Sequence, residues 1–154
     1  MPIVPYLYYR DVAKALAFLR KAFGATPVGD TVKDARGRIT HGSVLLGDDM
    51  VMMGCPGRTF KNPKKLGQTT QNLYVEVADV DAHHARAKRA GAAILEAPLD
   101  TPYGHRRYAV EDPEGHHWYF WHGLAAGTPA KATRATATRA ASRARKRPSR
   151  APKR

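Results

Sequence analysis

The sequence contains a single cysteine, and this scarcity excludes a disulfide within the chain. Cys55 has no Cys/His pattern around it, so we expect a core or loop thiol, not a catalytic nucleophile. No hydrophobic run approaches the roughly 18 residues of a membrane span, and the first residues lack the basic-then-apolar order of a signal peptide. These absences predict a cytoplasmic protein that does not bind to a membrane.

Acidic residues are missing from the C-terminal part of the chain. Of the 26 Lys and Arg residues, ten follow Gly123, whereas all 13 Asp and Glu residues precede it. Residues 124–154 also have no large apolar side chain after Leu124, so they cannot bury enough surface to fold and are predicted to form a disordered basic tail. Two interpretations stay open, namely non-specific contact with nucleic-acid phosphates and a purely solubilising extension.

Residues 1–123 divide into two halves with the same order of elements. β-Branched and aromatic residues predict the strands of the first half at 3–9, 26–32, 38–47 and 49–54. Asp11 occupies a helix N-cap position, and the apolar face that follows predicts a helix ending at Gly24. Residues 55–69 contain proline and glycine without periodicity and are predicted to form a loop.

The second half repeats this order. Its predicted strands lie at 70–79, within 93–104, at 105–112 and within 113–121, and its predicted helix lies at 80–92. Two pairs of dipeptides mark the repeat: Asp11-Val12 with Asp79-Val80, and Gly24-Ala25 with Gly91-Ala92. Their separations of 68 and 67 residues predict an α+β fold of two βαβββ modules, at 1–54 and 70–122.

Each predicted module has a four-stranded sheet with two faces and one helix to cover them. The helix protects one face, so the other face needs a partner sheet. Two modules, from one chain or from two copies, would therefore enclose a cleft between paired sheets, and such clefts bind small molecules.

Three segments resemble the vicinal oxygen chelate superfamily, which includes glyoxalase I, bleomycin-resistance proteins and extradiol dioxygenases. They are YLYYRDVAKALAFLRKAFGA, NLYVEVADVDAHHARAKRAGA and YAVEDPEGHHWYFW. The resemblance implies one domain of this superfamily over 1–123, built of paired βαβββ modules. It implies no single activity, because the scaffold serves ligand binding and several chemistries.

Metal-dependent members of the superfamily have four ligands, one on the first and one on the last strand of each module. Carried over to this sequence, the four positions are Val4, Met52, Asn72 and Tyr119. None of these residues is His, Asp or Glu, and an isopropyl group or a thioether does not bind a hard divalent cation. We therefore expect no metal at the superfamily's site and no cofactor.

The seven histidines offer one alternative to that expectation. His83 and His84 are adjacent on a predicted helix, point about 100° apart and cannot chelate one ion together. A site from His41, His105 and His117 would need them to converge, which no sequence spacing requires. Surface positions and hydrogen bonding in a pocket are the simpler interpretation of these side chains.

The segment DPEGHHWYFWH ends the second half and predicts an aromatic wall. Strand alternation puts His117, Tyr119 and Trp121 on one face, and the resemblance implies that this face lines the cleft. Trp118 and Phe120 then belong to the core. The same reasoning predicts these ligand-binding residues: Tyr6, Tyr8, Met52, Asn72, Tyr74, Glu76, His117, Tyr119 and Trp121.

Such a cleft suits a planar or aromatic ligand, including a cationic one for which Glu76 supplies the countercharge. We expect a homodimer that binds a small organic molecule without chemistry. An enzyme, lyase-like or dioxygenase-like, is the alternative, with His117 or Glu76 as acid or base and Tyr119 as a donor to an oxyanion. Two further interpretations stay open. In one, the aromatic residues fill a collapsed dimer core and bind no ligand. In the other, the domain is a dimerisation unit that delivers two basic tails to nucleic acid.

Overall fold

The computed structural model describes residues 3–124. The first module comprises β1 (Tyr6–Tyr8), α1 (Val12–Phe18), the π-helical turn η1 (Leu19–Phe23), β2 (Thr26–Lys33), β3 (Ile39–Leu46) and β4 (Asp49–Gly54). A linker contains α2 (Pro63–Leu66). The second module comprises β5 (Asn72–Glu76), α3 (Val80–Arg89), β6 (Ala93–Asp100), β7 (His105–Glu111) and β8 (His117–Gly123). Within 3–124, no helix is long and apolar enough to cross a membrane.

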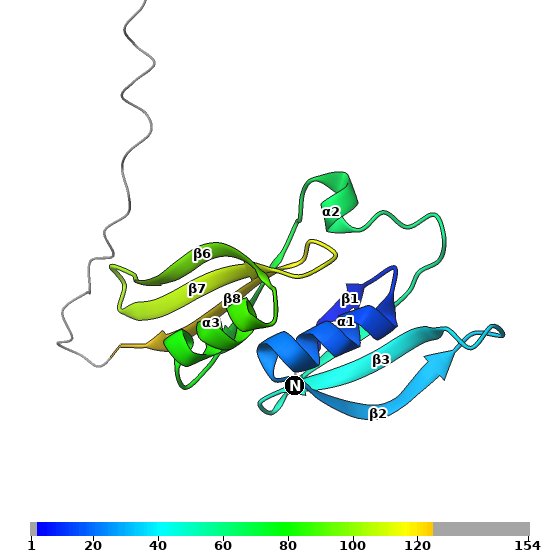
Figure 1. Ribbon diagram of the computed structural model, residues 1–154, viewed down its shortest axis with the longest axis horizontal. Coiled ribbons are helices and arrows are strands. Elements are labelled where there is room, and N and C mark those ends of the chain that lie inside the picture. Colours follow the sequence, from blue (N-terminus) through cyan, green and yellow to red (C-terminus); the bar gives the residue numbers. More distant parts are fainter. Residues whose placement is uncertain (1–2, 125–154) are drawn as a thin grey trace, which may run out of the picture.

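The strands form two four-stranded sheets, in the orders β1-β4-β3-β2 and β5-β8-β7-β6. In each sheet the first strand of the module runs parallel to the last strand, and the other neighbours are antiparallel. The sheets lie side by side, with α1 and α3 against the same side of the molecule (Figure 1). The predicted α+β fold of two βαβββ modules with paired sheets is confirmed.

Both long helices begin and end where the sequence predicts. The Asp11 and Asp79 side chains accept hydrogen bonds from backbone amides three residues on, at 3.0 and 2.9 Å. Gly24 and Gly91 take left-handed conformations, with φ of 80° and 86°, just beyond the helix ends. The first helix has one more residue between its Asp and its Gly than the second, and the π turn η1 accommodates that residue.

The linker differs from the prediction, because the expected loop at 55–69 contains α2. Asn62 caps this helix by accepting a hydrogen bond from Lys65 N at 2.9 Å, and Pro63 follows at the first helical position. Four residues are too few to show helical periodicity, so only the cap and the proline signalled the helix. The predicted tail, residues 124–154, lies outside the described residues apart from Leu124.

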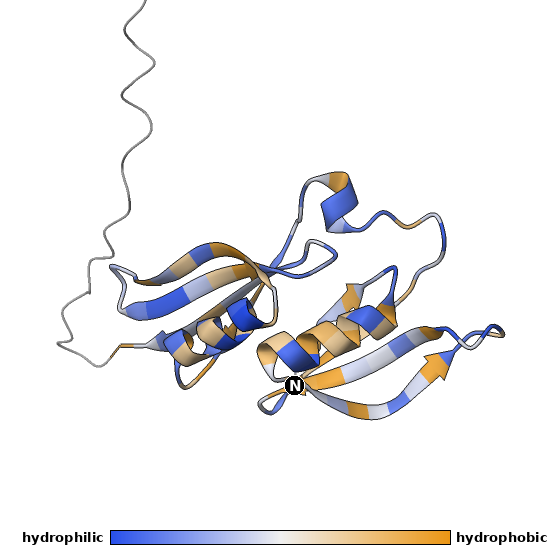
Figure 2. Cartoon of the chain, viewed as in Figure 1, coloured by the Kyte–Doolittle hydropathy of each residue, from blue (hydrophilic) through white to orange (hydrophobic). Residues whose placement is uncertain are grey.

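The helix-facing sides of both sheets share one hydrophobic core. Trp118 and Phe120, predicted as core residues, are both 0% exposed, and Phe23 of the first module packs against them at ring distances of 5.4 and 4.8 Å. Along α1 and α3, hydrophobic residues are interspersed with hydrophilic ones (Figure 2), as expected for helices with one buried side. Since Phe23 lies in η1, the helix of one module also covers the sheet of the other.

A buried carboxylate joins the two modules. Asp112 is 1% exposed and accepts hydrogen bonds from the Tyr9 hydroxyl at 2.6 Å, Trp118 Nε1 at 3.2 Å and the backbone amides of Glu114 and His116 at 2.9 and 3.1 Å. Burial and the adjacent carboxylate raise the pKa of Tyr9 well above its usual value, so this hydroxyl remains a donor. The network fixes the turn before β8 against the end of β1.

Replacing this carboxylate should therefore weaken the whole domain. Asp112→Ala leaves a buried hydroxyl, an indole N–H and two amides without their acceptor, and we expect a loss of about 3–5 kcal/mol in the free energy of unfolding. Urea denaturation followed by circular dichroism measures this loss. Asp30→Ala, at an exposed position in β2, is the control and should leave the transition unchanged.

A histidine bridges the modules beside this core. His83 of α3 lies 2.7 Å from the Tyr108 hydroxyl through Nδ1 and 3.1 Å from the Phe23 carbonyl oxygen through Nε2. The carbonyl oxygen requires a proton on Nε2, so Nδ1 of the neutral ring accepts from Tyr108. Desolvation lowers the pKa of His83 below its ordinary value, with a smaller contribution from Arg86, and hydrogen bonding to Phe23 opposes the shift.

This depressed pKa predicts acid sensitivity with a definite sign. The unfolded chain takes up a proton at His83 near pH 6.5, whereas the folded chain does so only at lower pH, so stability is lost as the pH falls from 6.5 toward the folded pKa. Thermal melts between pH 7.5 and 5 should show a decrease in Tm for the wild type. His83→Gln should reduce the slope; an unchanged slope would contradict the assignment to His83.

Candidate functional site

The first open face is the side of the β1-β4-β3-β2 sheet that no helix covers. The side chains of this face are mainly aromatic, aliphatic and thioether groups: Tyr6, Tyr8, His41, Ser43, Leu45, Met50 and Met52. The Tyr6 hydroxyl lies 3.0 Å from His41 Nδ1, and the Tyr6 and Tyr8 rings meet edge to face at 5.6 Å. Phe60 of the linker packs on Tyr8 at 5.9 Å and extends the apolar surface.

The second open face is the corresponding side of the β5-β8-β7-β6 sheet, and it is more polar. Its side chains are Asn72, Tyr74, Glu76, Glu96, Arg107, Ala109, Glu111, His117, Tyr119 and Trp121. Tyr74 and Tyr119 stack with centroids 4.7 Å apart and an interplanar angle of 5°. The Arg107 guanidinium carbon lies 5.1 Å from the centroid of Tyr119, in a cation–π contact.

Carboxylates pair with bases at several points of the second open face. Arg107 Nη2 lies 3.0 Å from Glu96 Oε2 and donates to Oε1 at 3.3 Å. Glu111 lies 3.3 Å from Lys64 Nζ and 3.7 Å from His117 Nε2. The face therefore combines a stacked aromatic pair with compensated charges.

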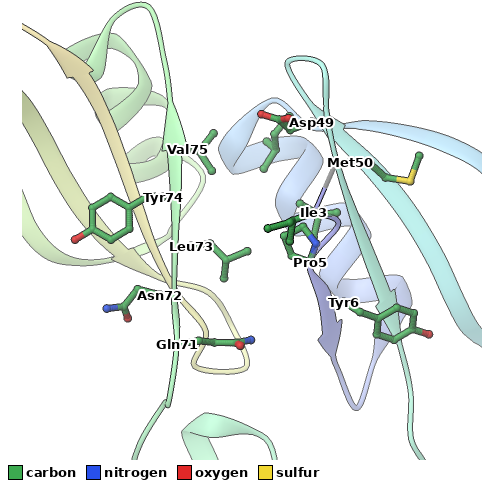
Figure 3. A pocket seen from close by; sticks show the side chains of 12 residues that line it. Ile3, Pro5, Tyr6, Asp49, Met50, Gln71, Asn72, Leu73, Tyr74 and Val75 are labelled. Carbon is green, nitrogen blue, oxygen red and sulfur yellow. The ribbon is translucent and has the colours of Figure 1, made fainter. Parts of the chain in front are cut away.

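The predicted ligand-binding residues fall on both open faces. Tyr6, Tyr8 and Met52 lie on the first face, whereas the other six predicted residues lie on the second. In Figure 3 the Tyr74 side chain points away from β1 and β4, and the Tyr6 side chain points away from β5. Within one chain the two groups therefore belong to two separate surfaces.

A cavity of about 510 Å³ lies between the two modules, where β1 and β4 approach β5 (Figure 3). Leu73 points into it opposite Pro5 and Ile3. The predicted residues Tyr6, Asn72 and Tyr74 border this cavity, although their rings and amide belong to the open faces. The cavity is a junction between modules and contains none of the aromatic stacks described above.

The metal-ligand positions of the resemblance carry no suitable set of donors. Val4 precedes β1 and Met52 lies on β4 of the first module, whereas Asn72 and Tyr119 lie on β5 and β8 of the second. His105 and His117 lie at opposite ends of the β7–β8 pair, about 20 Å apart at the rise of a strand, so they cannot bind one ion. Among residues 3–124, no three His, Cys, Asp or Glu side chains are grouped for a metal ion.

Several side chains of these faces are absent from the predicted set of ligand-binding residues, and Arg107, Glu96 and His41 are the most polar contacts among them. Glu96 would lie with Ile94 on the helix side if β6 alternated strictly. The register instead shifts between Ile94 and Glu96, and Glu96 stands opposite Ala109 on the second open face. A β-bulge of this kind redirects a side chain, and nothing in the sequence marks its position.

The geometry above agrees with comparisons to known proteins. Residues 3–120 match the Glyoxalase/Bleomycin resistance protein/Dioxygenase superfamily. The chain belongs to this superfamily. An uncharacterized protein of Mycobacterium bovis is 38% identical over 121 residues, which cover 74% of this chain and 78% of that protein. An uncharacterized protein of Mycobacterium tuberculosis shares the same identity, over 69% of its length.

Solved structures of superfamily members share the fold. TioX from Micromonospora sp. ML1 is 34% identical, with a TM-score of 0.66, and the match covers 80% of this chain and 99% of TioX. The fosfomycin resistance protein FosX from Mesorhizobium loti is 17% identical, with a TM-score of 0.54, covering 80% of this chain and 92% of FosX. At that identity FosX supports the fold alone.

Proposed function

We propose that this superfamily member is a metal-free small-molecule-binding protein, which holds a planar aromatic ligand between open faces contributed by two copies of the chain. The observation that carries the proposal is the exposure of large side chains on both open faces. Tyr6, Tyr8 and Tyr74 are 44%, 50% and 58% exposed. Apolar surface of this kind on a sheet is characteristic of a binding site or an interface.

A second copy is the partner that these faces require. The open faces of one chain point apart, so a neighbouring chain must supply the opposing sheet. A two-fold axis that brings the first face of one protomer onto the second face of its partner generates two equal clefts. Each cleft would have Tyr6 and Met52 on one side and the Tyr74–Tyr119 stack on the other.

Binding without metal chemistry is favoured by the donor set. Val4 and Met52 supply no hard donor at two of the four superfamily positions, and Asn72 and Tyr119 alone make a weak site. The enzyme alternative keeps His117 and Glu76 as acid–base candidates. His117 Nε2 lies 3.7 Å from a carboxylate oxygen of Glu111, so Glu111 is a second carboxylate, besides Glu76, for this alternative.

The basic tail and the cellular compartment remain predictions. The ten basic residues after Gly123 favour contact with phosphates, but all of them lie outside the described residues. The lone Cys55 donates a long hydrogen bond of 3.6 Å to the Arg10 carbonyl oxygen and suits a reducing compartment. We therefore retain the cytoplasm as the proposed location.

The binding proposal is tested by metal analysis and ligand titration of the same preparation. The protein, purified without a histidine tag, should contain no stoichiometric zinc, nickel, iron or manganese, and it should bind members of a panel of planar aromatic compounds. Tyr119→Leu removes half of the stacked pair and should weaken that binding by about tenfold in calorimetry. Ala17→Leu, at an exposed position of α1 on the helix side, is the control; a metal-dependent interaction would contradict the proposal.

The second copy is tested by the mass in solution. Sedimentation should give the mass of two chains for the wild type. Tyr8→Glu puts a carboxylate into the predicted interface and should raise the dimer dissociation constant by about a hundredfold or more. Ala17→Glu changes an exposed residue of α1, on the helix side and outside both open faces, and should remain dimeric. A monomeric wild type at micromolar concentration would rule out the shared cleft.

A further inference from the structure

Arg106 and Arg107 are consecutive residues near the start of β7, but their surroundings differ. The start of this strand is hydrophilic in Figure 2. Arg106 lies on the helix side, where each of its three guanidinium nitrogens donates to Asp81 or Asp100 at 2.6 to 2.7 Å. These hydrogen bonds raise the pKa of Arg106 and lower the pKa of Asp81. Arg106 is therefore a structural residue that ties α3 to β6.

Arg107 points to the second open face and has far fewer partners. Glu96 contacts only Nη2, and Nη1 reaches the Tyr74 hydroxyl at 3.5 Å, the outer limit of a hydrogen bond. Among residues 3–124, Nε has no hydrogen-bond partner. Because a guanidinium has five N–H donors, Nη1 retains capacity for a stronger acceptor than the Tyr74 hydroxyl.

The side chains around Arg107 Nη1 indicate which class of ligand would supply this acceptor. Tyr74 stacks on Tyr119 through one side of its ring, and the Tyr74 side chain is largely exposed. A planar ligand that continues the stack on Tyr74 would have its edge near the Tyr74 hydroxyl, which lies 3.5 Å from Arg107 Nη1. The donor is thus in position for an oxygen atom at the edge of a stacked ring.

We propose that Arg107 determines ligand specificity on the second open face by donating to a carbonyl or phenol oxygen on the edge of a neutral planar ring. This inference rests on the proposed function and names its ligand class. Glu96 already compensates the guanidinium charge, so the ligand needs no negative charge of its own. A cationic ring in the same place would be repelled by the Arg107 guanidinium beside the stack. Cationic ligands were among those expected from the sequence, and the position of Arg107 makes them less suitable than neutral ones.

The test compares matched pairs of fused-ring compounds that differ in a carbonyl group, such as coumarin with naphthalene and acridone with anthracene. The wild-type full-length protein should bind the carbonyl member about tenfold more tightly, as one charge-assisted hydrogen bond predicts. Arg107→Met keeps an apolar chain of similar length and should reduce the preference to about twofold or less. Calorimetry and Trp121 fluorescence provide the readouts.

Two further variants separate recognition from folding. Arg107→Lys retains the charge without the planar fork and should keep part of the preference. Glu96→Gln removes the compensating charge and should strengthen binding of a ring carboxylate by about tenfold relative to the neutral carbonyl compound. Arg36→Met, on the β2–β3 turn, is the control and should behave as the wild type, and circular dichroism melts monitor folding.

The outcomes separate this inference from the proposed function. Equal binding of both members of each pair to the wild type, with no effect of Arg107→Met, would overturn the role of Arg107 while the aromatic site stands. Failure of every compound to bind would overturn the proposed function together with the inference. Both the inference and the proposed function are supported if the wild type prefers the carbonyl compounds, Arg107→Met loses this preference and Arg36→Met keeps it.

Discussion

Each four-stranded sheet has two faces, and the chain provides one long helix per sheet. α1 with η1 and α3 therefore pack together on one side, where a single core contains Phe23, Trp118 and Phe120 from both modules. This shared core fixes the sheets side by side and leaves their other faces open. The aromatic residues on the open faces are thus exposed because no further helix covers them, and a second chain or a ligand can cover them instead.

The turn between β7 and β8 controls how the modules meet. Asp112 binds Tyr9, and Glu114 accepts hydrogen bonds from the amides of Arg10 and Asp11 at 2.8 and 2.9 Å and from Asn62 at 2.8 Å. Gly115 has no room for a side chain, since a Cβ would clash with the Lys64 backbone. One short turn therefore connects the first module, the linker and the strand that contains Tyr119 and Trp121.

The sequence was sufficient for the order of the strands and of the two long helices, though not for α2, because caps such as Asp11 and Asp79 and the alternation of Trp118 and Phe120 are local signals. Strand alternation separated Tyr119 from Trp118 and Phe120, and the resemblance to the superfamily implied which of the two faces lines the cleft. The sequence was insufficient for Glu96, because a bulge in β6 reverses the side to which this residue points. Its pairing with Arg107 depends on the register between two strands, which tertiary packing sets.

The internal repeat makes the difference between the two faces informative. The row Tyr8, Gly54 and His41 on the first sheet occupies the same places as Glu76, Trp121 and Arg107 on the second. The scaffold is thus repeated, whereas the first row has a phenol, a glycine and an imidazole where the second has a carboxylate, an indole and a guanidinium. If two copies close on each other as proposed, every cleft combines both open faces. The mainly apolar first face would then exclude water from the ligand, while the polar second face would form hydrogen bonds with the edge of the ligand. Two identical faces would supply only one of these properties.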